Sequence, residues 1–150
     1  MEQAATQMAQ TMAQTMAQMS NGIIPVSTLY IGLNALIMFI LSALVVRARM
    51  QTGVEVGDGG REELIKAQRA HGNNVEYVPI SLLILIAVEL AGAPVWLLHG
   101  LGGGLTVARI AHGIGLHTST GRSPGRAVGA SLSWLVMLAG SIACIYYGLN

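Results

Sequence analysis

The stretch that decides the fold is residues 23–46, IIPVSTLYIGLNALIMFILSALVV, which runs without a charged side chain. An α-helix rises about 1.5 Å per residue, so a helix of this length can cross the roughly 30 Å of hydrocarbon in a bilayer. The whole chain has the same character, because 53% of its residues are hydrophobic and only 10% are charged. Ordinary soluble domains are about 25% charged. The sequence therefore predicts an integral membrane protein.

We expect three further membrane-spanning helices, which makes the chain an all-α bundle of four helices in one domain. The second is unusual, because its apolar part, residues 77–90, is too short to cross alone and must borrow length from residues 64–76. Pro79 inside it should remove one backbone hydrogen bond and kink the helix. The second helix should begin near Glu62, and the third and fourth spans cover residues 95–116 and 127–149.

Two polar loops and a tail complete the chain. Residues 47–61 (RARMQTGVEVGDGGR) and 117–126 (HTSTGRSPGR) carry glycine and charge, which is typical of loops exposed to water. Residues 1–22 form a low-complexity tail that repeats Met-Ala-Gln and lacks the positive region of a signal peptide, so the membrane domain covers residues 23–150. We interpret residues 102–104, three glycines, as a place where helices approach closely.

The basic residues predict an orientation. All 8 Lys and Arg residues fall in or beside the two polar loops, and none lies in the tail or in the turn at residues 91–94. The positive-inside rule therefore places both loops in the cytoplasm and both termini outside it. A net charge of +1 excludes binding to the many phosphates of nucleic acid. The single cysteine, Cys144, provides neither a disulfide framework nor a cysteine cluster for a metal, and we predict no metal site.

Charged groups inside the second and third spans require a reason, because each costs about 2.5 to 3.5 kcal/mol at the centre of a membrane helix. Arg69, Asn73 and Glu76 are spaced by four and then three residues, which places them on one helical face. Arg109 and His112 are one turn apart on the third span. Both sets lie near the cytoplasmic ends, so they can face one site.

Two interpretations of these charges stay open. They can surround a small, mostly anionic molecule that enters from the cytoplasm, with Glu76 holding its cation. They can equally form structural salt bridges, between Arg69 and Glu76 or Glu62, or between Arg109 and Glu76. The further cations of the first interpretation are Arg47, Arg122 and Arg126; Arg47, Arg49 and Arg122 can also be anchors that snorkel to headgroups.

Three polar residues fall outside this group. We interpret His99 as a histidine buried in mid-span with a backbone or Ser/Thr partner, and His117 as an incidental residue of the second loop. Glu89, at the extracytoplasmic end of the second span, should lie at the membrane interface.

Two motifs resemble those of a known family. The run RAHGNNVEYVP at residues 69–79 is similar to the signature of the MAPEG family (membrane-associated proteins in eicosanoid and glutathione metabolism). The run RIAH at residues 109–112 resembles that family's Arg-x-x-His on its third helix, and RARM followed by GDGG resembles its bacterial branch. The similarity extends from Leu29 to the C-terminus.

The resemblance implies a homotrimer in the bacterial inner membrane, with glutathione bound between neighbouring subunits near the cytoplasmic end. Glutathione has two carboxylates for Arg and His donors, an ammonium for Glu76 and a thiol that Arg126 can hold as catalytic thiolate. The residues similar to the family's glutathione ligands are Arg47, Asn73, Glu76, His112 and Arg126, and those in structural or supporting positions are Arg69, Arg109 and Tyr77.

The implied activity is that of a membrane-bound glutathione transferase in detoxification. It would conjugate glutathione to lipophilic electrophiles, or reduce lipid hydroperoxides, that arrive from the membrane lipids. The chain departs from several family members, which have a second Arg, two Tyr and a Ser where it has Gly72, Leu116, Ala130 and Ala127. We therefore expect weak or narrow activity. The alternative is a non-catalytic lipid-binding or scaffold protein of the same fold; a transporter or channel is disfavoured because the polar residues gather at one membrane edge.

Overall fold

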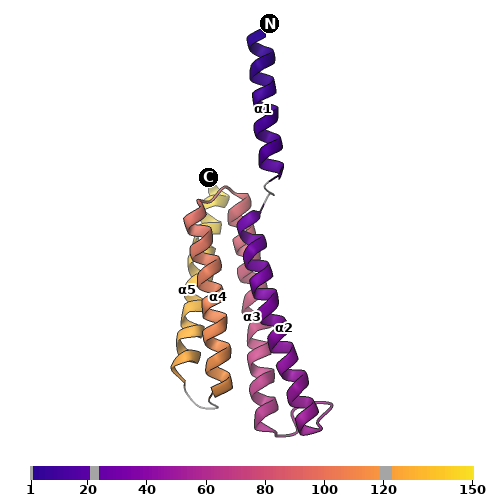
Figure 1. The fold of residues 1–150 in the computed structure, drawn as a ribbon. Coiled ribbons are helices and arrows are strands. Elements are labelled where there is room, and N and C mark those ends of the chain that lie inside the picture. The colour runs from indigo at the N-terminus through magenta and orange to yellow at the C-terminus, as the bar shows by residue number, and fades with distance from the viewer. Residues whose placement is uncertain (1, 21–23, 119–122) are drawn as a thin grey trace.

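The computed structural model describes residues 2–20, 24–118 and 123–150, and all regular structure in this part of the chain is helical. Helices α2 to α5 run side by side, whereas α1 stands apart and packs against none of them (Figure 1). The prediction of an all-α chain is therefore confirmed. The bounds are α1 (Glu2–Ser20), α2 (Pro25–Thr52), α3 (Glu62–Leu90), α4 (Val95–Thr118) and α5 (Pro124–Leu149).

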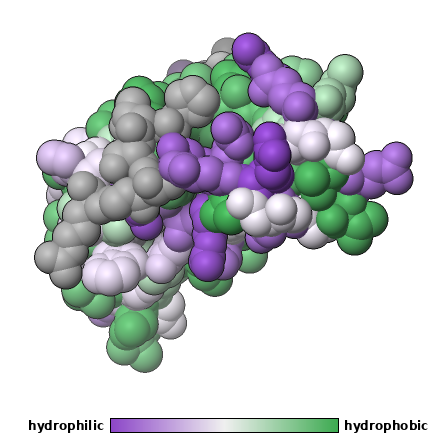
Figure 2. All heavy atoms as spheres, turned by 90° about the horizontal axis from the view of Figure 1, so that it is seen from below, coloured by the Kyte–Doolittle hydropathy of each residue, from purple (hydrophilic) through white to green (hydrophobic). Residues whose placement is uncertain are grey.

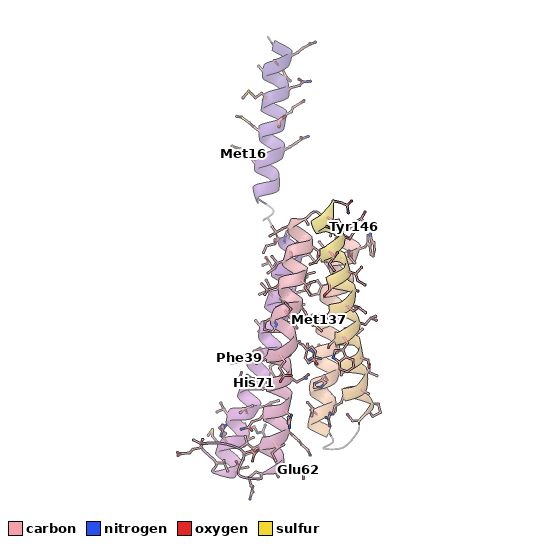
Figure 3. All side chains as sticks on the ribbon, turned by 180° about the vertical axis from the view of Figure 1, so that it is seen from behind. Met16, Phe39, Glu62, His71, Met137 and Tyr146 are labelled. Carbon is pink, nitrogen blue, oxygen red and sulfur yellow. The ribbon has the colours of Figure 1, made fainter. Side chains whose placement is uncertain are left out.

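The packed helices carry apolar side chains on their outside as well as between them. Leu64, Leu85 and Leu105 are almost fully buried between helices. Phe39 is 71% exposed on the outer face of α2 (Figure 3), and Leu138 on α5 is 61% exposed. Soluble proteins rarely expose apolar surface along whole helices. The outer surface therefore suits a hydrocarbon environment.

Among the described helices, α2, α3 and α5 are long and apolar enough to cross a membrane. The chain is thus a helical membrane protein. Helix α4 falls outside this group, and it contains three consecutive glycines, three histidines and Arg109. It packs against α2, α3 and α5, and its Arg109 and His112 side chains are buried among these neighbours.

Local sequence explains where the helices end. Helix α2 continues to Thr52 because Gly53 then adopts the left-handed conformation (φ 68°) and donates its N–H to the carbonyl of Arg49 (2.9 Å). Residues 47–52, predicted as loop, are therefore helical. In the same way residues 117–118 belong to α4, and Ser123 caps α5 by accepting the N–H of Arg126 (3.3 Å), so residues 124–126 form its first turn.

The two ends of the packed helices differ in chemistry. The loop at residues 53–61, the end of α4 and the start of α5 lie together, and the turn at residues 91–94 and the end of α5 lie at the opposite end (Figure 1). A view onto the first end shows a concentration of hydrophilic residues (Figure 2). We call the first the polar end (residues 47–76, 109–118 and 123–126) and the second the turn end (residues 25–34 and 89–106, with the end of α5). Glu62 and Tyr146 mark these opposite ends (Figure 3).

Glycines let α4 approach its neighbours closely. A Cβ at Gly102 would collide with the ring of Tyr30 on α2, and one at Gly104 would come within 2.9 Å of Val136 on α5. The predicted role of the triple glycine is therefore confirmed at these two positions. Small residues at such contacts are the usual way in which membrane helices gain packing.

Candidate functional site

Arg109 is the centre of a polar cluster that joins α3, α4 and α5. Its side chain is only 2% exposed. Nη1 donates to the side-chain oxygen of Asn73 at 2.9 Å, and Nη2 donates to the Ser133 hydroxyl and to the Gly129 carbonyl at 3.4 Å. The Tyr77 ring lies over the guanidinium group, whose carbon is 5.4 Å from the ring centroid. Arg109 therefore clamps three helices together, and we call these five residues the Arg109 cluster.

The cluster continues outward through hydroxyl groups. The Tyr77 hydroxyl accepts the indole N–H of Trp134 at 3.1 Å, and the Ser133 hydroxyl donates to the Gly129 carbonyl at 2.7 Å. A salt bridge between Arg109 and Glu76 was one interpretation of the sequence. In the described part of the chain, however, the hydrogen-bond partners of Arg109 are neutral groups. Ser133 and Gly129 escaped the sequence analysis, although their spacing of four residues on a small-residue face could have indicated a helix contact.

Glu76 and Arg69 lie outside this cluster, and both side chains are exposed. Among the described residues no ion pair joins them to each other, and the ion pair on this helix is between Lys66 and Glu62 (2.9 Å). Asn73, which lies between them in the sequence, is half-buried and bonded to Arg109. The predicted ligands on α3 are thus divided between an inward amide and an outward carboxylate.

His112 and Arg126 are brought together by the contact between α4 and α5. His112 is 8% exposed and lies within electrostatic range of Arg126. A Cβ at Gly129 would come within 2.6 Å of the His112 backbone nitrogen, so only glycine permits this approach. Arg126 is half-buried one turn earlier on α5. The structure therefore places these two predicted ligands at one helix contact.

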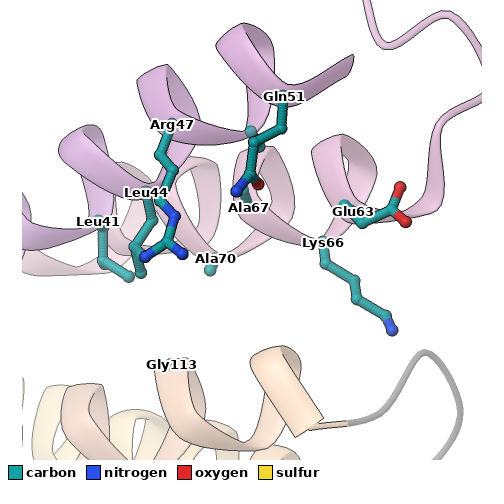
Figure 4. A pocket seen from close by; sticks show the side chains of 10 residues that line it. Leu41, Leu44, Arg47, Gln51, Glu63, Lys66, Ala67, Ala70 and Gly113 are labelled. Atoms are coloured by element: carbon teal, nitrogen blue, oxygen red, sulfur yellow. The ribbon is translucent and has the colours of Figure 1, made fainter.

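Arg47 lies elsewhere, in the space between α2, α3 and α4 (Figure 4). Its side chain lines a pocket of about 240 Å³ whose walls include Ala67 of α3 and Gly113 of α4. Glu76 follows Ala67 by 76 − 67 = 9 residues, or about two and a half helical turns, so it points to the opposite side of α3. Within one chain, Arg47 and Glu76 do not face the same space.

At the turn end, Glu89 has a structural contact that the sequence analysis missed. Its carboxylate oxygens accept the backbone N–H groups of Val26 (2.9 Å) and Ser27 (2.6 Å) at the start of α2. Because the side chain of Ile24, at the N-cap position, makes no capping hydrogen bond, Glu89 of α3 satisfies these donors instead.

The expectation for His99 is wrong. It is exposed near the start of α4, not buried in mid-span, and its Nδ1 lies 2.9 Å from the Tyr30 hydroxyl. The cause is the glycine at position 102, which lets the Tyr30 ring lie against α4 and reach the histidine one turn earlier. Asn34, one turn after Tyr30, donates to the Thr106 hydroxyl at 3.1 Å.

The fold and these polar clusters define a small helical protein of the membrane. The chain matches the MAPEG family over residues 27–146, and it belongs to that family. It is 41% identical over 122 residues to the inner membrane protein YecN of Escherichia coli K12. The aligned residues cover 81% of this chain and 92% of the relative. YecN of Escherichia coli O6:H1 matches to the same extent. The family resemblance of the two motifs is confirmed.

Proposed function

We propose that this protein is a glutathione transferase of the bacterial inner membrane. In this proposal α4 crosses the bilayer with α2, α3 and α5 as a four-helix bundle, and three copies assemble into a trimer. The polar end faces the cytoplasm, which supplies glutathione. Membership of the MAPEG family, which includes glutathione transferases, and the membrane location in the name of the YecN relative support this assignment.

The observation that carries the proposal is the exposed carboxylate of Glu76. It lies 76 − 62 = 14 residues after the start of α3, or about 21 Å along a helix that is membrane-capable. A carboxylate that faces lipid on such a helix is costly and requires a partner. No described residue of its own chain is paired with it. A neighbouring copy that covers this face, with the ammonium group of glutathione between them, would satisfy Glu76.

The division of the predicted ligands also supports a site between copies. Because Arg47 of α2 and Glu76 of α3 face spaces on opposite sides of α3, we infer that a single glutathione reaches both when they come from adjacent subunits. In this arrangement the cations hold the two carboxylates of glutathione, and Glu76 holds its ammonium group. The proposed ligands are Arg47, Asn73, Glu76, His112 and Arg126, with Arg126 next to the thiol.

The proposed reaction is thiolate attack on a lipophilic electrophile that enters from the bilayer. A carbon–sulfur bond forms, the leaving group departs or an epoxide opens, and the protein contributes orientation and stabilisation of the thiolate. With a lipid hydroperoxide, two glutathione molecules would be oxidised to the disulfide while the hydroperoxide becomes an alcohol and water.

A second candidate is a non-catalytic lipid-binding or scaffold protein of the same fold. It is favoured by positions where the chain lacks a hydroxyl. Leu116 is buried against Leu41 and Ala70 in the core of its own chain, and Ala127 and Ala130 have no hydroxyl at the two positions of α5 where several family members have Ser and Tyr.

Isothermal titration of the purified protein with glutathione, in detergent, separates the two candidates. We expect binding, with Glu76→Gln weakening it by about 1.5 to 3 kcal/mol, or roughly 10- to 150-fold, through loss of a charge-assisted hydrogen bond. Glu55→Gln, an exposed carboxylate of the 53–61 loop, is the matched control and should leave affinity unchanged. Absence of binding favours the second candidate, and unchanged affinity of Glu76→Gln overturns the proposed site.

A further inference from the structure

A continuous groove runs between α2 and α4 from the polar end toward the middle of the helices. Its outer part is the pocket of about 240 Å³ that Arg47 lines. Its inner part is a hollow of about 320 Å³ with walls that include Ile37 on α2 and Ile110 on α4. Leu41, Leu44 and Gly113 line both parts, so they form one groove, which we call the α2–α4 groove.

We propose that the α2–α4 groove binds a single-chain anionic amphiphile, a long-chain fatty acid, with its carboxylate at Arg47. This inference goes beyond glutathione transfer and does not rest on it. Arg47 also belongs to the proposed glutathione ligands, so the two ligands would compete for this guanidinium group.

The charges at the mouth of the groove fit one carboxylate. Lys66 is already paired with Glu62, whereas Arg47 makes none of the hydrogen bonds or ion pairs found among the described residues. Its guanidinium group points into the gap toward Gly113 (Figure 4). Guanidinium binds a carboxylate through two parallel hydrogen bonds. Glu63, which also lines the mouth, opposes a more negative headgroup.

The dimensions of the groove fit one acyl chain. From Arg47 to Ile37 is ten residues, or about 15 Å along α2, which is about half the roughly 30 Å hydrocarbon thickness of a bilayer. The groove is therefore about as long as one leaflet is thick. Its inner walls come from two helices and are apolar except for Arg109, whose guanidinium group is bonded to Asn73 and Ser133. This lining suits a single chain and not two.

Gly113 makes the junction between the two parts. A Cβ at this position would touch only Leu41, at an ordinary 3.7 Å, so packing does not require glycine there. A larger side chain at Gly113 would instead fill the groove. This provides a variant outside the proposed glutathione ligands.

The test uses palmitic acid with a photoactivatable diazirine on its chain and the full-length protein in phosphatidylcholine nanodiscs, in glutathione-free buffer. After irradiation, mass spectrometry should locate cross-links in residues 37–44 and 110–114. Unlabelled palmitate should compete and methyl palmitate should not. We expect labelling to fall about tenfold in Arg47→Gln and at least as much in Gly113→Leu.

Two matched controls should label like the wild type. Arg61→Gln removes an exposed cation of the same end, and Gly100→Leu adds the same side chain to α4 where a Cβ meets nothing. If Gly113→Leu loses its wild-type circular dichroism, Gly113→Ala replaces it, with partial loss of labelling expected.

Equal competition by the methyl ester, or labelling that ignores both Arg47 and Gly113, would overturn the proposal and leave Arg47 as a headgroup anchor. Displacement of the fatty acid by phosphatidylglycerol would overturn it in favour of a two-chain lipid. Since glutathione is absent, none of these outcomes depends on the proposed enzyme activity.

Discussion

The two ends of the molecule use polar side chains inside a membrane protein in different ways. At the turn end, the Glu89 carboxylate, the His99 ring and the Asn34 amide nitrogen bond to other groups of the same chain, and the buried Asn34 Oδ1 has no partner among the described residues. At the polar end, the two terminal nitrogens of Arg109 are bonded internally, and its Nε has no partner among the described residues. The exposed side chains of Glu76 and Arg47 make no hydrogen bond or ion pair with the described residues at all.

The difference shows which intramembrane polar residues indicate a ligand. A structural role is sufficient to explain an internally bonded group such as Glu89. It satisfies donors that would otherwise be buried without a partner, which is costly. An exposed charge such as Glu76 is not explained by its own chain. The residues with functional promise are therefore the exposed charges at the polar end that have no partner among the described residues of the chain, and not the buried Arg109, whose terminal nitrogens are bonded.

The largest expected difference between the ends is the side of the membrane that each faces. A cysteine replacing Glu55 should react with an impermeant maleimide only from the cytoplasmic side, and one replacing Ala91 only from the other. Both positions are exposed, and Ala91 has φ −79°, so neither substitution strains the backbone as one at Gly92 (φ 82°) would. The background is Cys144→Ala, and the assay compares spheroplasts with inside-out vesicles. Labelling of both cysteines from one side would contradict a four-span chain.

A second, smaller effect concerns stability at the polar end. Arg109→Met should lower the free energy of unfolding by about 2 to 6 kcal/mol, because the Asn73 amide and the Ser133 hydroxyl each lose a partner worth about 1 to 3 kcal/mol. Denaturant titration in mixed micelles measures this, with the exposed Arg61→Met as control. A loss below 1 kcal/mol would show that water or lipid replaces the clamp.

Much of the fold could be predicted from the sequence, because uncharged runs and glycine-rich breaks report directly on helices in a membrane. The start of α3 at Glu62 and the turn before Val95 agree with the structure. The predicted end of α2 was wrong, because a charged run such as RARM also suits a helix that extends beyond the bilayer. Whether Pro79 kinks α3 stays a prediction.

The partners of individual side chains could not be predicted, because they depend on how helices rotate against each other. Spacing placed Arg69, Asn73 and Glu76 on one face of α3, yet small rotations decide that Asn73 turns to Arg109 while Glu76 stays outside. The Glu89 contact with α2 was equally hidden, because the two groups are about sixty residues apart in the sequence. The roles of the five proposed glutathione ligands stay predictions.

A third prediction sets one carboxylate of each end against the other. Glu89→Ala should cost about 1.5 to 3 kcal/mol of stability, since two backbone N–H groups of α2 lose a charged acceptor, and should leave glutathione affinity unchanged. Glu76→Ala should do the reverse. Unfolding and titration are measured on both variants. If both variants changed stability and glutathione affinity in the same way, the distinction between a structural and a ligand-binding carboxylate would be lost.

The smallest expected effect on glutathione affinity is at Arg126, whose proposed role is ionisation of the thiol more than binding. It is half-buried in the first turn of α5, next to Ala127, which has no hydroxyl to share the task. A cation within roughly 4 to 6 Å favours a thiolate. Arg126→Gln should therefore raise the pKa of the thiol of bound glutathione by about one to three units, toward the ordinary thiol value near 8.5. Affinity should change by less than about tenfold, or 1.4 kcal/mol, because the other ligands remain. The measurement follows thiolate absorbance against pH in wild type and variant, with Arg61→Gln as the control cation. An unchanged midpoint would leave Arg126 as a headgroup anchor, and a wild type without thiolate at pH 7 would favour the non-catalytic candidate.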